Sequence, residues 1–159
     1  MKHKRLRFGQ RFRLALVLFM AGCGLLPAVP VLVYDGPARP LDQVAVLGEA
    51  SSTATLTAIN GKPQVSYLKE NRHAKGYHVL PGVHVLKVAS QVRPAMSAGG
   101  TGFRWEETEL TLEAKAGHTY MPRAVRTPTG EVRIWMEDMG TNFDQDCLGV
   151  LLAGTFSKC

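Results

Sequence analysis

Acidic residues are missing from the first 34 positions of this 159-residue chain. The same stretch holds six Lys or Arg residues, all of them before Leu14. The apolar stretch that follows them, from Leu14 to Met20, is by itself too short to cross a bilayer core about 30 Å thick. The small residues Ala21 and Gly22 come next. This order of charged, apolar and small residues is that of an export signal.

The sequence Met20-Ala21-Gly22-Cys23 resembles the lipobox of bacterial lipoproteins, in which the cysteine is diacylated and becomes the new N-terminus. The family usually has Leu where this chain has Met20, a change between similar apolar side chains. The resemblance implies a signal peptide over residues 1–22 and a lipid anchor on Cys23, with the membrane as a partner. Gly24 rather than Asp follows the cysteine, which by similarity to the sorting rule of enteric bacteria implies the outer membrane, facing the periplasm.

The positive charge of the chain belongs to this signal. The whole chain carries a formal charge of +6, but cleavage before Cys23 removes six of its 19 basic residues and none of its 13 acidic ones. A neutral mature chain lacks the basic surface that a polyanion needs, so nucleic acid is excluded as a partner. The remaining length suffices for one domain with its own core.

In an alternative interpretation the signal is not cleaved, and Leu14 to Val33 form one membrane span. Its length would suffice, but Pro27 and Pro30 fall in its last third and disfavour a helix there. We therefore expect residues 23–40 to be a lipidated cysteine and a proline-rich tether that leads into an edge strand.

Helical periodicity is absent from the middle of the chain, where apolar and polar residues alternate instead. Asn60-Gly61 is a strong hairpin signal, and residues 64–68 are the expected return strand. Residues 147–153 are the one candidate for a short helix. The pattern predicts an all-β fold, a single antiparallel β-sandwich of about six to eight strands over residues 41–138. The expected core comprises Val44, Val46, Leu56, Leu86, Val88, Leu110, Leu112, Ile134 and Met136.

Three short stretches resemble the pattern of PEGA-like domains, which are small transthyretin-like β-sandwiches in exported bacterial proteins. They are Asn60-Gly61-Lys62, residues 80–88 (LPGVHVLKV) and residues 116–120 (AGHTY). The opening YDGP at 34–37, followed by VAV at 44–46, is similar to small bacterial lipoproteins with that domain. The resemblance covers about residues 34–138, and departs from the family in the glycine-rich insertion 96–102 and in the tail after Asp138. It implies a fold and an envelope location, and it brings no catalytic residues.

Residues that would carry catalysis are sparse. No nucleophile elbow, Cys–His pair or paired-carboxylate frame stands out, so we expect no enzymatic activity, no metal and no cofactor. The alternative is a metal-dependent periplasmic enzyme that uses His73, His78 or His84, but no Cys or carboxylate completes a ligand set at the usual spacing. Residues 142–147 begin like an EF-hand loop and then lack its glycine and glutamate, which leaves only a looser calcium site open.

Two aromatic residues, Phe103 and Trp105, follow the glycine-rich stretch. They form a candidate partner-binding tip, although the same side chains could fold back on the core. The favoured function is a non-catalytic lipoprotein of the bacterial cell envelope, a binding or structural module. Its partner would be an envelope protein or glycan.

Cysteines are few, with only Cys23, Cys147 and Cys159 present. If Cys23 is lipidated, the other two form an even pair in an oxidising compartment, where a disulfide is expected. This bridge would hold the apolar run 148–152 of the C-terminal tail, residues 139–159, against the sandwich. Two free thiols are the alternative.

Overall fold

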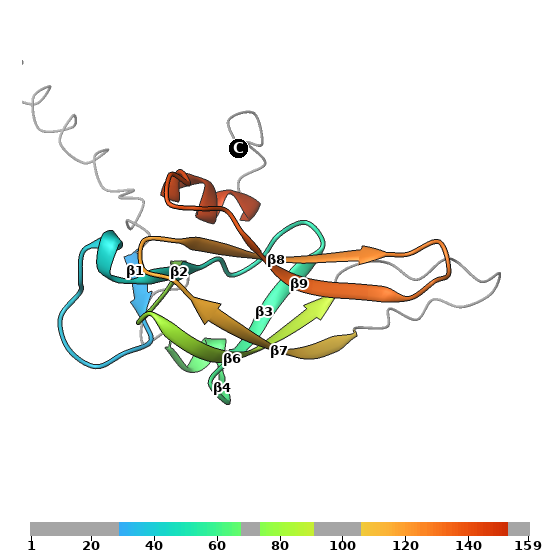
Figure 1. The fold of residues 1–159 in the computed structure, drawn as a ribbon, viewed down its shortest axis with the longest axis horizontal. Helices are drawn as coiled ribbons and strands as arrows, with labels where there is room; N and C mark the ends of the chain where they lie inside the picture. Colours follow the sequence, from blue (N-terminus) through green and yellow to red (C-terminus); the bar gives the residue numbers. More distant parts are fainter. Residues whose placement is uncertain (1–28, 68–73, 91–105, 153–159) are drawn as a thin grey trace, which may run out of the picture.

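The computed structural model describes residues 29–67, 74–90 and 106–152. Within these ranges the chain is mostly β-strand, and its strands form two sheets, so the all-β prediction is confirmed (Figure 1). One sheet has five strands in the order β1-β5-β2-β8-β9, and the other has four in the order β4-β3-β6-β7. The strands are β1 (Val29–Leu32), β2 (Ala45–Leu47), β3 (Ala54–Ile59), β4 (Lys62–Pro63), β5 (Ala74–Val79), β6 (Gly82–Ser90), β7 (Glu107–Ala114), β8 (Thr119–Arg126) and β9 (Val132–Asp138). Three 3-10 helices accompany them: η1 (Leu41–Gln43), η2 (Gln64–Tyr67) and η3 (Gln145–Leu152).

Most neighbouring strands run antiparallel, but two pairs do not. β1 pairs with β5 and β2 pairs with β8 in the parallel sense. The expectation of a wholly antiparallel arrangement is therefore wrong at these two places. Parallel neighbours require a long crossover between them, and the partners here are indeed far apart in the sequence. Alternation of apolar and polar residues within one strand carries no information about such a distant partner.

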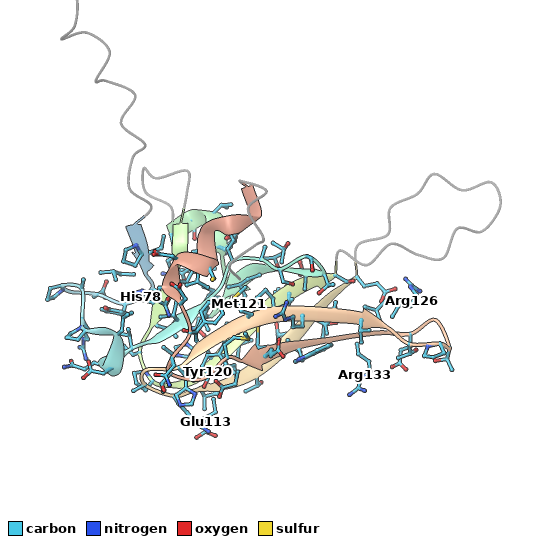
Figure 2. The ribbon with its side chains drawn as sticks, turned by 90° about the horizontal axis from the view of Figure 1, so that it is seen from above. His78, Glu113, Tyr120, Met121, Arg126 and Arg133 are labelled. Carbon is cyan, nitrogen blue, oxygen red and sulfur yellow. The ribbon has the colours of Figure 1, made fainter. Side chains whose placement is uncertain are left out.

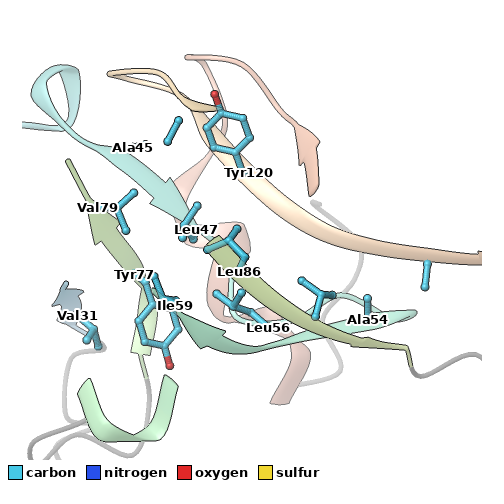
Figure 3. Packing of buried hydrophobic residues seen from close by; sticks show 13 residues of the cluster. Val31, Ala45, Leu47, Ala54, Leu56, Ile59, Tyr77, Val79, Leu86 and Tyr120 are labelled. Carbon is cyan, nitrogen blue, oxygen red and sulfur yellow. The ribbon is translucent and has the colours of Figure 1, made fainter. Parts of the chain in front are cut away.

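One hydrophobic cluster takes side chains from both sheets (Figure 3). Leu47 and Tyr77 come from the five-stranded sheet, and Leu56 and Leu86 from the four-stranded one, and all four are fully buried. The predicted core is confirmed in its main lines: Val44, Val46, Leu56, Leu86 and Val88 are buried, and Leu110, Leu112, Ile134 and Met136 are half-buried and pack against the cluster.

β7 is an edge strand of the four-stranded sheet, and its residues alternate as the sequence predicts. Leu110 and Leu112 point toward the core, whereas Glu109 and Glu113 are exposed to solvent. At its start, Glu107 lies 3.7 Å from the ammonium group of Lys87 on β6. This edge therefore presents a row of acidic side chains, part of which β6 neutralises.

β2 is buried on both of its faces. Ala45 and Leu47 belong to the cluster between the sheets, while Val46 packs on the other side against Met121 and Leu148. Leu148 belongs to η3, so the C-terminal segment covers the outer face of the five-stranded sheet at this point. The prediction of a short helix over 147–153 is confirmed over 147–152, which belong to a 3-10 helix over Gln145–Leu152, while residue 153 lies outside the described ranges.

Two glycines provide the space that Leu148 occupies. A Cβ atom at Gly48 would lie 2.2 Å from the sulfur of Met121, and one at Gly76 would lie 3.2 Å from a methyl carbon of Leu148. Gly76 also has a φ of +123° in the middle of β5, at the irregularity in the pairing of β5 with β1. Side chains at these positions would displace η3 from the sheet.

The predicted return strand over residues 64–68 is wrong over 64–67, while residue 68 lies outside the described ranges. The turn forms at Asn60, whose φ of +50° is tolerated by asparagine, but β4 ends at Pro63. Proline has no N–H to donate to the ladder. The chain continues as η2, where the hydroxyl of Tyr67 donates a hydrogen bond to the carbonyl of Ile59 at 3.1 Å.

The range expected to be a tether contains the edge strand β1. Pro30 is compatible with this place, because prolines in sheets occur at edges. The last residues of the alternative span, Leu14 to Val33, are thus in a strand rather than a helix. Among the described residues no helix has the length and apolarity needed to cross a membrane.

The packing of η3 leads to a prediction. Leu148 is only 5% exposed, so Leu148→Ala should lower the free energy of unfolding by about 2–5 kcal/mol through lost burial and a residual cavity. Leu41→Ala is a matched control at a side chain that is 47% exposed, and should change stability by less than about 0.5 kcal/mol. Chemical denaturation measures both. If Leu148→Ala changed the free energy of unfolding as little as Leu41→Ala does, η3 would add nothing to the stability of the sheet.

Candidate functional site

The outward side chains of β8 and β9 form the most distinctive surface of the described residues, which we call the Trp135 face. It consists of Arg123 and Val125 on β8, and Arg133, Trp135 and Glu137 on β9. Arg123 lies opposite Trp135, and Val125 lies opposite Arg133. Trp135 is 40% exposed and Val125 is 46% exposed. Figure 2 shows Arg133 directed away from the strands. The face continues the surface that η3 covers at Met121.

Strand alternation fixes this arrangement. On β9, Ile134 and Met136 point toward the core cluster, which leaves Arg133 and Trp135 on the opposite side of the strand. The Nε atom of Arg123 donates to a carboxylate oxygen of Glu137 at 2.5 Å. This ion pair holds the Arg123 side chain in place at the position across the strands from Trp135.

A second cluster lies near the other end of the same two strands, where sequence analysis placed no site. The Nδ1 atom of His118 lies 2.9 and 3.0 Å from the two carboxylate oxygens of Asp138. The backbone N–H of Gly140 donates to the same carboxylate at 2.9 Å. The ring of His118 also stacks on Tyr120, with 6.2 Å between centroids. The carboxylate thus fixes one ring nitrogen of His118 and orients the imidazole.

The electrostatics of Asp138 follow from these contacts. Partial burial acts to raise its pKa, but the hydrogen bonds from His118 and Gly140, with the positive charges of His118 and Lys115, outweigh it and lower the pKa below the ordinary 3.8. Asp138 is therefore a carboxylate over the physiological pH range. A His–Asp pair alone is not a catalytic site, because it needs a nucleophile or a metal to act on.

His84, one of the histidines of the enzyme hypothesis, has a structural role. Its Nε2 lies 2.7 Å from the carbonyl of Leu80, which fixes that nitrogen as a donor. Its Nδ1, 3.0 Å from the side-chain nitrogen of Asn60, must then accept. Asn60 in turn accepts a hydrogen bond from the backbone N–H of Val85 at 3.1 Å. Both nitrogens of His84 are thus engaged, and neither is available to a metal in this arrangement.

His78 lies on the other sheet. Its neighbours Tyr77 and Val79 point into the core, so His78 faces the opposite side, which η3 partly covers. The imidazole is buried, its Nδ1 has no hydrogen-bond partner within the described part of the chain, and burial lowers its pKa. His78 and His84 therefore do not converge. In the ranges that the structure describes, no group of three or more His, Cys, Asp or Glu side chains is placed to hold a metal ion.

Several predicted site residues lie outside the described ranges. They are the lipidation site Cys23, the aromatic pair Phe103 and Trp105, the histidine His73 and the second cysteine Cys159. Cys147 is described and half-buried at the start of η3. The lipid anchor, the aromatic tip and the disulfide thus stay predictions.

The outward position of Trp135 can be predicted from the sequence. The alternation of residues 132–137 already predicts that Arg133, Trp135 and Glu137 share the outward side. The sequence does not show that Arg123 and Val125 of β8 lie beside them, because that depends on the pairing register. The His118–Asp138 pair depends on the same register across twenty residues.

Comparison with known proteins adds no relative: a scan against family models, a search of curated proteins and a search of solved structures each found no match. The PEGA-like resemblance accordingly remains an expectation that rests on its motif residues.

The Asp138 contacts predict an order of pKa changes. In His118→Gln the pKa of Asp138 should rise, because the strongest of the lowering contacts is removed. In the matched variant Lys115→Gln, which removes only the weakest of the lowering interactions, the rise should be smaller. The carboxyl carbon of Asp138, followed by NMR against pH, reports both. Because the folded pKa is depressed, the stability from this pair is present above the ordinary pKa and is lost as the pH falls through the folded value. The same midpoint in all three proteins would refute this assignment.

Proposed function

We propose that this chain is a non-catalytic lipoprotein of the bacterial cell envelope, anchored through Cys23, that binds a partner protein on its Trp135 face. The two sheets act as one β-sandwich of PEGA-like type, supported by the hydrophobic cluster that they share. The outer membrane, facing the periplasm, is the proposed location. A Cys147–Cys159 disulfide would close the tail that η3 begins.

The observation that carries the binding role is the exposed tryptophan beside two arginines on a rigid sheet. Tryptophan and arginine are enriched among the residues that dominate protein–protein binding energy. On this face Arg123 is already held by Glu137, whereas Val125, Arg133 and Trp135 are exposed. A planar guanidinium next to an indole suits a protein surface that offers a carboxylate and an apolar cavity. We therefore favour a protein over a glycan as the partner.

The enzyme hypothesis receives less support. It requires His73, His78 or His84 to bind a metal. Both ring nitrogens of His84 are engaged in hydrogen bonds within the fold, and His78 lies on the five-stranded sheet whereas His84 lies on the four-stranded one. The His118–Asp138 pair is the best alternative centre for chemistry. Among the described residues, no third His, Cys, Asp or Glu joins this pair to form a metal site.

The anchor is tested by the mass of the N-terminal peptide of the protein purified from membranes. We expect a chain that begins at Cys23 and carries several acyl chains, since a single chain gives only marginal membrane binding. The variant Cys23→Ala should carry no lipid. A chain that still begins at Met1 with an unmodified Cys23 would refute the anchor and favour the uncleaved span.

The partner is tested by a photo-crosslinking amino acid placed at position 135 in living cells. We expect a protein adduct that Arg133→Glu weakens, because the reversed charge repels the carboxylate proposed on the partner. Position 83 is the matched control, since Val83 is 68% exposed on the outer side of the other sheet. Adducts that are the same from both positions would refute the Trp135 face. An adduct to a glycan alone would replace the protein partner by a glycan.

A further inference from the structure

We infer that the end of the domain at which β1 begins rests on the lipid headgroups of the anchoring membrane, with Val65 of η2 in contact with them. This inference rests on the proposed lipidation of Cys23. We call this surface the anchor end. It comprises the starts of β1 and β5, together with Lys62 and Val65.

The length of the tether carries the inference. β1 begins at Val29, six positions after Cys23, so the chain between them reaches about 20 Å when fully extended. As a flexible coil it would span about 13 Å on average. A domain of about 120 residues has a radius of gyration near 14 Å, which corresponds to a diameter of about 35 Å. The tether is thus shorter than the domain is wide, and the domain has no room to turn over on it.

The position of β1 determines which surface of the domain faces the membrane. β1 and β5 run parallel, with Val29 paired to Ala74, so both strands start at the same end of the sheet. η2 lies at that end of β5, and the hydroxyl of Tyr77 points toward it (Figure 3). This hydroxyl donates a hydrogen bond to the side-chain oxygen of Gln64 on η2. Figures 1 and 2 place the turn between β8 and β9 at the opposite end of the long axis.

The chemistry of η2 suits a membrane surface. Val65 is 64% exposed, and Lys62 is exposed just before it. An apolar side chain gains from entering the headgroup region, and a lysine near an anionic leaflet adds a favourable charge interaction. The lipid surface is therefore an occupant whose chemistry matches this end.

The test uses the lipidated full chain in vesicles of phosphatidylethanolamine and phosphatidylglycerol. A nitroxide-bearing residue is placed at position 65 or, as a matched control, at position 129 in the opposite turn, where Thr129 is also exposed. We expect the access of a water-soluble nickel chelate to position 65 to fall on reconstitution, relative to the Cys23→Ala protein in solution. Access to position 129 should not change.

A flexible spacer of Gly and Ser residues inserted between Gly24 and Leu25 should restore access to position 65, because it lets the domain move away from the bilayer. Protection that persists with the spacer would overturn the claim that the tether sets the orientation. Equal access at positions 65 and 129 on a protein whose Cys23 is lipidated would overturn the inference and leave the proposed function intact. An unmodified Cys23 would instead overturn the proposed anchor itself.

Discussion

The structure depends on a single strand of three residues. β2 pairs with β5 on one side and with β8 on the other, so among the described residues it is the strand through which the two halves of the five-stranded sheet are hydrogen-bonded. Few backbone hydrogen bonds hold so short a strand, so side-chain burial must supply the rest. Ala45 and Leu47 fill the space between the sheets, and Val46 is covered by η3. The C-terminal segment is therefore part of the domain rather than an appendage.

The limits of sequence analysis follow from the same strand. The alternation of Val44 and Val46 predicts one buried face, yet Val44 to Leu47 are all buried. What covers the second face is Leu148, about a hundred positions away, and no local pattern connects the two. In contrast, β7 and β9 each have one face on the core and one in solvent, and for them alternation is a sufficient guide. The failure at residues 64–67 has a different cause, since Pro63 ends the ladder before the apolar pattern does.

The candidate sites, too, can be predicted from the sequence only in part. Outward residues of one strand, such as Trp135, can be found from the sequence, whereas the partners opposite them depend on the register. Histidines that are close in the sequence lie on different sheets, because His78 is near the end of β5 in the first sheet and His84 is near the start of β6 in the second. Proximity along the chain is misleading where the chain crosses between sheets. For His84 the decisive contacts come from Leu80, close to it in the sequence, and from Asn60, which lies in the turn between β3 and β4.

The acidic edge strand β7 would have a consequence for the lipid-anchored protein that we propose. Confinement to a surface raises the local concentration of copies and aligns them, which favours the addition of one open sheet edge to another. Glu109 and Glu113 on β7 would face the same carboxylates of a neighbouring copy, and their mutual repulsion disfavours that pairing. If the proposed anchor crowds copies on a bilayer, the acidic residues of β7 would thus disfavour their pairing through this edge.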